Sequence, residues 1–276
     1  MVRVASVQAN VKFGDPFANA VAVIAELERL KDEGVELAIF PEAFLTGYCV
    51  SCAADAKGIG IAADSEPITS IQQTCERLDM LAVVGFAELA GEDIYNAAAL
   101  FEPGQTTRIY RKTHLPELGL DKFAAAGAGP LPVYETRLGK IGVLICFDMR
   151  FPEATRSLAL QGADLIALPT NWPEGAEVSA DHIAIARAAE NRVFFASCNR
   201  AGEENGFRFI GRSKIIDPTG KVLAAAGEGP ETVMADLDFA LARQKRTITI
   251  PGKYETEVMN ARRPELYSQL TCDITG

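Results

Sequence analysis

Residues 141–152 read IGVLICFDMRFP, an apolar run that ends in Cys146 and leads to a proline. Such a short apolar run predicts a buried strand, and Pro152 suits the first position of a following helix. The stretch therefore predicts a strand-to-helix turn with Cys146 at its corner. Open α/β sheets bind ligands at the carboxyl ends of their strands, so the turn also predicts where a site lies.

The same alternation of strand and helix patterns extends along the chain in both directions. Short apolar runs predict strands at residues 2–8, 37–41, 81–88, 94–101, 108–114, 141–147, 165–169 and 193–198. Amphipathic windows predict helices at residues 18–30, 68–78, 152–161 and 178–191. The turn signature DPTG at 217–220 predicts a hairpin of residues 209–216 and 222–226. Strands that alternate with helices predict the α/β class.

The composition of this 276-residue chain is that of a globular protein with a large core, since 48% of its residues are hydrophobic and 23% charged. No shift in composition marks a boundary, so we expect a single domain over residues 1–276. The tail from about 240 to 276 has too little apolar surface to pack alone. We expect it to pack on the body or on a second subunit.

The formal net charge of the chain is -10, from 27 Lys and Arg against 37 Asp and Glu. This charge repels phosphate backbones and anionic lipids, so we expect neither nucleic acid nor a membrane as a partner. No apolar run approaches the roughly 18 to 20 residues of a membrane span, and the N-terminus lacks an export signal. Six cysteines are too few for a disulfide scaffold, and we expect a cytoplasmic protein with reduced thiols.

Cys146 is the first candidate for chemistry. A thiol at a strand-to-helix turn is displayed at the sheet edge, and the positive end of the helix favours the thiolate, the form that attacks electrophiles. The alternative is a small buried cysteine that simply ends an apolar strand. The position alone does not decide between the two.

Glu42 and Lys112 are the other two candidates. Glu42 directly follows an apolar strand, where burial would shift the pKa of its carboxyl toward acid–base work; the alternative is a solvated loop carboxylate. Lys112 stands beside Arg111 on a predicted strand, so one of these cations points inward. An inward ammonium can stabilise an oxyanion, whereas the alternative is a solvated lysine on an edge strand.

Seven segments, taken in their order along the chain, resemble the nitrilase superfamily of carbon–nitrogen hydrolases. The three that hold the candidates are FPE at 40–42, YRKTHLP at 110–116 and CFDMRFPE at 146–153. The others are LPTNWP at 168–173, RAAEN at 187–191, the stretch from GRS at 211–213 to IDPTG at 216–220, and RRPELY at 262–267. The resemblance spans nearly the whole chain.

The resemblance implies a four-layer α-β-β-α sandwich, a triad of Glu42, Lys112 and Cys146, and a homo-oligomer, commonly a homodimer. It also implies a second carboxylate after the lysine. Asp121 is the first candidate for that place, and Glu117 is the second.

The implied reaction is hydrolysis of a small linear carboxamide. Cys146 attacks the carbonyl carbon while Glu42 takes the thiol proton, and Lys112 with the backbone N–H of Phe147 holds the oxyanion. Ammonia leaves, and Glu42 then activates water against the thioester. The reaction needs neither a metal nor an organic cofactor.

The residues after the cysteine resemble amidases and omega-amidases more than true nitrilases, which usually have a Trp-Glu pair there. We expect Asn171 and Trp172 to line the acyl pocket. Arg150 either meets a substrate carboxylate or forms an ion pair with Glu153 or Glu190. An N-carbamoyl or ureido amidohydrolase and a nitrilase remain the alternative activities.

Two interpretations of other classes also stay open. A papain-like enzyme would pair Cys146 with His114 or His182 and with an asparagine such as Asn199. A binding or regulatory module would keep the fold without turnover, although an intact triad argues against it. The isolated histidines offer no recognisable metal site.

Overall fold

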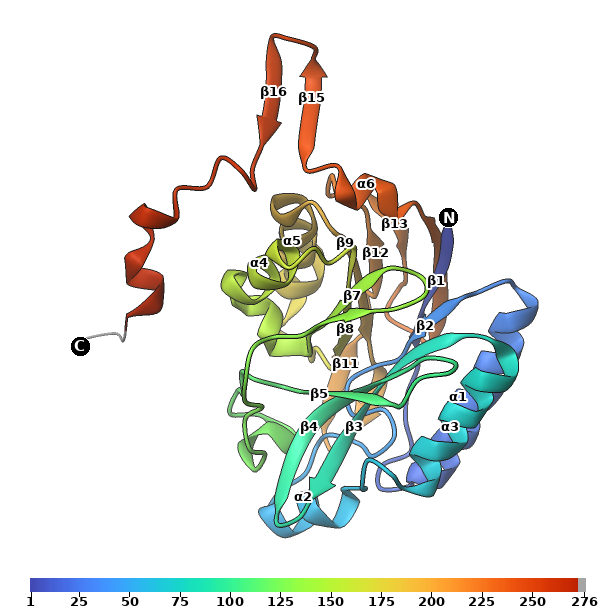
Figure 1. The fold of residues 1–276 in the computed structure, drawn as a ribbon. Coiled ribbons are helices and arrows are strands. Elements are labelled where there is room, and N and C mark those ends of the chain that lie inside the picture. The colour runs from blue at the N-terminus through green and yellow to red at the C-terminus, as the bar shows by residue number, and fades with distance from the viewer. Residues whose placement is uncertain (273–276) are drawn as a thin grey trace.

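The structure, a computed structural model, describes residues 1–272 and is built around two six-stranded sheets (Figure 1). The first sheet has the order β14 (Glu231–Leu237), β1 (Val2–Gln8), β2 (Leu37–Ile39), β3 (Leu81–Ala90), β4 (Asp93–Phe101) and β5 (Arg108–Arg111). The second sheet has the order β13 (Val222–Ala225), β12 (Lys214–Ile216), β9 (Phe194–Asn199), β8 (Leu165–Thr170), β7 (Lys140–Val143) and β6 (Val133–Glu135).

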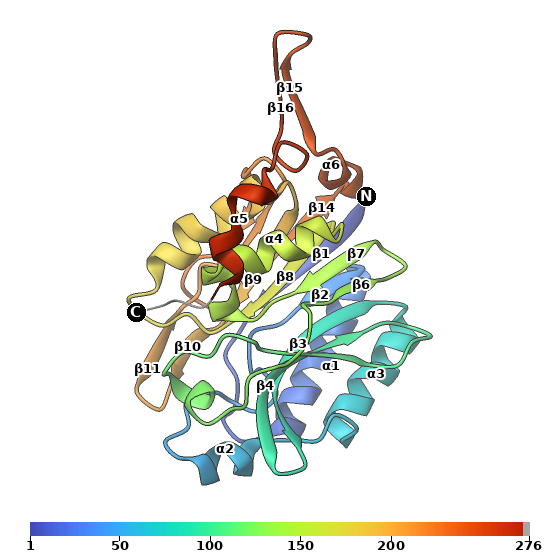
Figure 2. The ribbon, with the colours of Figure 1, turned by 60° about the vertical axis from the view of Figure 1, so that its left-hand side comes forward.

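Helices cover the outer face of each sheet, so the layers follow the order α-β-β-α (Figure 2). The first sheet is covered by α1 (Pro16–Asp32) and α3 (Glu66–Leu78), and the second by α4 (Pro152–Leu160) and α5 (Ala184–Asn191). Side chains on β2 alternate accordingly: Ile39 packs in the core between the sheets, and Ala38 packs under the helices. The predicted four-layer sandwich is confirmed.

Strand directions bring several strand ends to one edge. The pairs β1–β2, β2–β3, β7–β8 and β8–β9 are parallel, while β5 pairs antiparallel with β4, itself antiparallel to β3. The strand β5 therefore runs in the same direction as β3. The segments after β2, β5, β7 and β8 carry Glu42, Lys112, Cys146 and Asn171, respectively.

The predicted hairpin of residues 209–216 and 222–226 is wrong in its first arm. Phe207–Ile210 forms β11, which pairs with β10 (Ala201–Glu204), and only β12 pairs with β13. The break lies at Gly211 and Arg212, whose φ angles of 63° and 62° are left-handed and end an extended strand. Gly211 is required here because a Cβ would lie 2.6 Å from the Gln8 side chain.

Several other predicted elements differ at an end. The predicted strand 108–114 stops at Arg111, so Lys112 follows β5 (Arg108–Arg111). The predicted helix 178–191 starts as one π-helical turn, η3 (Ser179–Ile183), before α5. The predicted strand 141–147 stops at Val143, because Cys146 already begins the 3₁₀-helix η2 (Cys146–Arg150).

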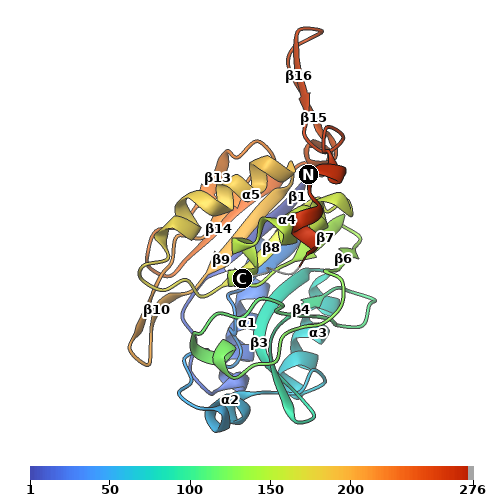
Figure 3. The same ribbon diagram turned by 90° about the vertical axis from the view of Figure 1, so that its left-hand side faces the viewer.

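The C-terminal region extends away from the sandwich and then returns to it. After α6 (Phe239–Arg243), the hairpin of β15 (Arg246–Ile250) and β16 (Tyr254–Glu257) projects outward (Figure 3). The chain then passes α4, where Arg156 Nη1 lies 3.1 Å from Met259 Sδ. The short helices η4 (Pro264–Leu266) and η5 (Ser268–Thr271) follow. Part of the tail thus lies against the body.

The remaining helices are short. They are α2 (Ala53–Ile59) and the 3₁₀-helix η1 (Gly119–Lys122). None of the helices within residues 1–272 is both long and apolar enough to cross a bilayer.

Gly85 on β3 allows the backbone of residues 41–43, which carries Glu42, to pack directly against this strand. A Cβ at Gly85 would lie 2.5 Å from Ala43 N and Pro41 O and 2.7 Å from Glu42 Cα. These are backbone atoms, which cannot move aside without moving the segment. The contact is also hydrogen-bonded, since Gly85 N donates to Pro41 O over 3.2 Å and Leu45 N donates to Gly85 O over 3.1 Å.

We predict that Gly85→Ala lowers the free energy of unfolding by about 1–3 kcal/mol, the usual cost of an overpacked site. Urea denaturation of the purified variant measures the change. The matched control is Gly58→Ala on α2, where a Cβ meets no atom within 4 Å. That control should be neutral or stabilising, because alanine favours a helix. Equal stability of Gly85→Ala and the parent protein would contradict the role given to Gly85.

Candidate active site

Cys146 sits at a strained turn and lines a cavity. It is the first residue of η2, and its φ of 45° is left-handed, which is uncommon for a residue with a side chain. Such backbone strain persists only where the surrounding structure imposes it, and it is frequent at functional sites. The partly buried Cys146 borders a cavity of about 280 Å³. The turn therefore presents a thiol to a cavity.

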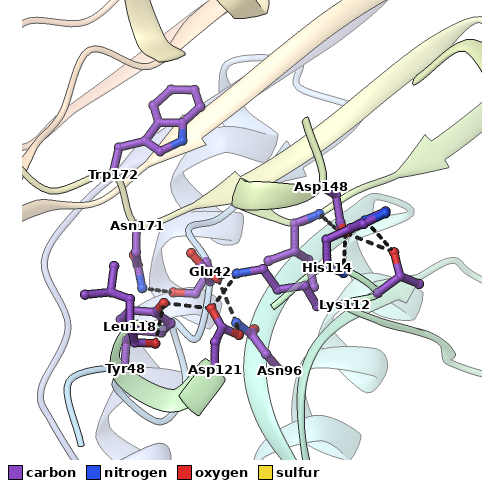
Figure 4. A network of polar contacts seen from close by, with 12 residues as sticks. Glu42, Tyr48, Asn96, Lys112, His114, Leu118, Asp121, Asp148, Asn171 and Trp172 are labelled. Carbon is purple, nitrogen blue, oxygen red and sulfur yellow. Dashed lines mark hydrogen bonds and ion pairs between the residues drawn. The ribbon is translucent and has the colours of Figure 1, made fainter. Parts of the chain in front are cut away.

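Lys112 lies between two carboxylates in the interior (Figure 4). Its Nζ is 2.7 Å from Glu42 Oε1 and 2.6 Å from Asp121 Oδ2, and all three side chains are fully buried. Arg111 points to the other side of the strand and pairs with Glu88 over 2.6 Å. The ion pairs show that the inward cation is Lys112 and that its ammonium is held by two anions.

The buried charges shift one another's ionisation. Burial raises the pKa of Glu42 and so does Asp121, while Lys112 lowers it; the net pKa lies above the ordinary value. Burial by itself would lower the pKa of Lys112, but Asp121 and Glu42 outweigh it and raise that pKa. Lys112 therefore remains a cation, and Glu42 is the carboxyl poised to take up a proton.

The thiol of Cys146 is protonated at neutral pH, contrary to the expectation that the helix end favours a thiolate. Burial and the neighbouring Glu42 raise the pKa of Cys146 to about 12, although Lys112 acts in the opposite direction. The turn η2 is too short to have a strong dipole, so burial wins. A base must therefore remove the thiol proton for Cys146 to act as a nucleophile.

The second carboxylate beside the lysine is Asp121, because Glu117 is exposed. Asp121 lies on η1, and its Oδ2 also accepts a hydrogen bond of 2.7 Å from the Tyr48 hydroxyl. That hydroxyl lies 3.0 Å from Leu118 O as well. The tight 3₁₀ turn brings the short side chain of Asp121 within reach of Lys112.

Asn171 and Trp172 follow β8 and form one wall of the cavity. Asn171 Nδ2 donates to Glu42 O over 2.9 Å, which joins the two sheets at the site. Phe147 also borders the cavity. At the rim lies the exposed Arg150, for which the described part of the chain offers no ion pair, whether with Glu153 or with Glu190.

Asp148 was not singled out from the sequence, yet it joins two segments of the site. Its Oδ2 accepts hydrogen bonds from Tyr110 OH (2.8 Å) and Ile145 N (3.0 Å). Its Oδ1 accepts from Thr113 OH and His114 N, each at 3.0 Å, and lies 2.7 Å from His114 Nδ1. One buried carboxylate thus ties the strand of the buried lysine to the turn of the thiol.

The papain-like arrangement does not form within residues 1–272. The ring of His114 contacts Asp148 and stacks on Phe151 at 3.9 Å between centroids. His182 lies in η3 and does not border the cavity. Asn199 binds main-chain groups of the neighbouring loops instead.

Comparison with known proteins identifies the family. Residues 3–247 match the family model of the carbon–nitrogen hydrolases. The chain belongs to this family. The resemblance to the nitrilase superfamily is therefore confirmed, and the site described above is the candidate active site of a hydrolase that acts on carbon–nitrogen bonds.

Relatives of this hydrolase include enzymes and a solved structure. It is 34% identical over 269 residues to a nitrilase of Pyrococcus abyssi, covering 97% of this chain and 99% of that one. It is 30% identical over 249 residues to 2-oxoglutaramate amidase of Bacillus subtilis, covering 88% and 93%. The crystal structure of an amidase from Nesterenkonia sp. has the same fold, with a TM-score of 0.82, 24% identity and coverage of 98% and 96%.

We predict that Asp148→Asn destabilises the hydrolase by about 1.5–3 kcal/mol at pH 7, because an amide cannot accept hydrogen bonds on both of its heteroatoms. Burial opposes ionisation, but hydrogen bonds from His114 and Ile145 hold the pKa of Asp148 below its ordinary value. Because the pKa of Asp148 is lower in the folded state than in the unfolded state, its ionised form stabilises the fold at pH values above the unfolded pKa of about 4. This stabilisation is lost as the pH falls from about 4 through the folded-state pKa.

The difference in unfolding free energy between the parent protein and Asp148→Asn should therefore shrink below about pH 4. Urea denaturation at pH 7 and at lower pH measures this trend, with the exposed Asp64→Asn as the matched control. A difference that stays constant with pH would show that the ionised carboxylate is not what joins the two segments.

Proposed function

We propose that this protein is an amidohydrolase that converts a small linear carboxamide into a carboxylate and ammonia through a thioester on Cys146. The observation that carries the proposal is a cavity-lining thiol whose ionisation is influenced by Glu42 and Lys112 of the buried acid–amine cluster. Glu42 Oε2 supports it further, because this buried oxygen has no hydrogen-bond partner in the described chain. An unpartnered carboxylate oxygen is a suitable acceptor for the thiol proton.

In the first half of the proposed reaction, Cys146 Sγ attacks the carbonyl carbon of the amide while its proton passes to Glu42. A lysine ammonium has three N–H donors, of which Glu42 and Asp121 take two, so Lys112 keeps one for the oxyanion. The N–H of Phe147 lies in the first turn of η2, where helical N–H groups lack an intrahelical acceptor. It is the second donor to the oxyanion.

The second half uses the same groups in reverse. Glu42 gives its proton to the leaving nitrogen, the C–N bond breaks, and ammonia departs. Glu42 then takes a proton from a water molecule that attacks the thioester, and the proton returns to Cys146 as the carboxylate product leaves. The proton that leaves with ammonia is thus replaced by one from water, and the cation of Lys112 stabilises whichever of Glu42 and Cys146 is anionic.

We propose an amide with a carboxylate at its far end as the preferred substrate. The cavity of about 280 Å³ admits only a short acyl chain, and Trp172 and Leu118 give it apolar walls. The guanidinium of Arg150 at the rim is the group that would recognise a carboxylate. The relative named 2-oxoglutaramate amidase supports this choice, because its name describes such a compound. N-carbamoyl compounds and nitriles are the competing substrates.

We predict that the purified protein releases ammonia from short omega-amides, and that Cys146→Ala abolishes this release while the protein stays folded. Ammonia is measured over a panel of aliphatic amides, omega-amides, N-carbamoyl compounds and nitriles, and circular dichroism checks the fold. Mass spectrometry of the acid-quenched reaction should detect the acyl group on Cys146. Full activity of Cys146→Ala would exclude the thioester, and inactivity on the whole panel would favour a binding module.

We predict that Arg150→Gln raises KM for omega-amides about 10- to 100-fold and leaves KM for neutral aliphatic amides unchanged. A hydrogen bond to a charged group contributes about 1.5–3 kcal/mol, which corresponds to this range. Steady-state kinetics with paired substrates of equal chain length measures the effect. Arg77→Gln, which removes the same charge from the far surface, is the control. A KM for omega-amides that does not change would remove Arg150 from substrate binding.

A further inference from the structure

Asn96 is a buried amide on β4 in the middle of the charge cluster (Figure 4). Its Nδ2 donates to Glu42 Oε1 over 2.7 Å and to Asp121 Oδ1 over 2.8 Å. Its main-chain carbonyl accepts a hydrogen bond of 2.8 Å from Lys112 N. Asn96 therefore contacts both carboxylates and also fixes the backbone of the lysine between them.

The hydrogen bonds at Glu42 divide its two oxygens into different roles. Oε1 accepts from both Lys112 Nζ and Asn96 Nδ2, so its two acceptor sites are occupied. Oε2 is buried and has no partner among residues 1–272. A proton that moves to Glu42 therefore has one acceptor oxygen available, and two donors from neighbouring segments fix the orientation of that oxygen.

We propose that Asn96 is a positioning residue that holds Glu42 Oε1 and thereby keeps Oε2 free and oriented for proton exchange with Cys146. This inference rests on the proposed amide hydrolysis, in which Glu42 is the base. Lys112 alone fixes the orientation less well, since its ammonium donates to Asp121 as well as to Glu42 and is also the proposed donor to the oxyanion. The planar amide of Asn96 has two N–H groups at a fixed angle, one for each carboxylate.

Asn96 also compensates a charge imbalance. Two carboxylates share one ammonium, so the anions repel each other at short range unless further donors lie between them. The hydrogen bond from Asn96 lowers the pKa of Glu42, against the effects of burial and of Asp121. Without this bond, the pKa of Glu42 should be higher. Glu42 should then keep its proton up to a higher pH and act as a base over a narrower pH range.

The titratable groups around Glu42 are few. Lys112 and Asp121 act on its ionisation, and Glu42 in turn raises the pKa of Cys146 and contributes to the raised pKa of Tyr48 and of the buried Cys49. Tyr48 stays neutral and Lys112 stays charged near neutral pH, because both pKa values are raised. The acid limb of a profile of kcat/KM against pH near neutrality therefore reports on the proton that Glu42 and Cys146 share.

The test compares Asn96→Leu, which keeps the size and removes the donors, with the parent protein. We expect kcat/KM for the best amide of the panel to fall about 10- to 100-fold, and its acid limb to move up by about one to two pH units. The matched control is Asn191→Leu, which changes an equally buried asparagine on α5 outside the site. That control should leave the position of the acid limb unchanged.

A second readout does not depend on turnover. Iodoacetamide alkylates a thiol faster when a base removes the thiol proton, so its rate on Cys146 against pH reports on Glu42. We expect the rise in this rate to move to higher pH in Asn96→Leu. This holds even if no amide of the panel is hydrolysed, so failure of the proposed function and failure of this inference are distinguishable.

If Asn96→Leu does not fold, Asn96→Asp replaces it, because that side chain has the same shape and removes both N–H donors. It should also move the alkylation profile to higher pH, since a third acid near Glu42 disfavours ionisation. The inference is overturned if the acid limb and the alkylation profile of the folded variant coincide with those of the parent protein. A loss of activity without a shift in pH, matched by Asn191→Leu, would likewise overturn it.

Discussion

The ion pairs of Lys112 with Glu42 and Asp121 are the interaction on which the rest of the site depends. Charged groups are costly to bury, and they persist in an interior only when paired and hydrogen-bonded. Here one ammonium pairs with two carboxylates, and neutral donors from Asn96 and Tyr48 add further hydrogen bonds, while Glu42 Oε2 has no partner in the described chain. These groups come from separate segments of the first half of the chain, so the cluster exists only in the folded sandwich.

The face-to-face packing of the two sheets explains why the thiol meets this cluster. Glu42 and Lys112 follow strands of the first sheet, whereas Cys146 follows a strand of the second. Asn171 donates a hydrogen bond to the backbone of Glu42, and Asp148 accepts hydrogen bonds from Tyr110 of the first sheet and from Ile145, which follows β7 of the second. These bonds join the two sheets where the chemistry is proposed. The proposed nucleophile and base are thus positioned by sheet packing rather than by a mobile loop.

Much of this arrangement could be predicted from the sequence, for identifiable reasons. Apolar strands that end abruptly in Glu42 or Cys146 reveal sheet edges, and two adjacent cations require one of them to point inward. Asn96 carries no such signal, because an asparagine in a strand pattern does not indicate which distant carboxylates it meets. The choice between Asp121 and Glu117 depends on a single 3₁₀ turn, and the break at Arg212 depends on a left-handed residue, neither of which periodicity can reveal.

The expectation that the helix end favours a thiolate at Cys146 is wrong, and the reason bears on the proposed reaction. Burial and the neighbouring Glu42 raise the pKa of Cys146 far above neutral pH, so the resting thiol is protonated. Oxidation and unselective alkylation require the thiolate, so burial protects the sulfur while no substrate is bound. Reactivity then has to come from transfer of the proton to Glu42 during attack, when Lys112 stabilises the charge that moves onto the substrate oxygen. Under the proposed reaction, the sulfur is therefore reactive only toward electrophiles that reach it in the cavity.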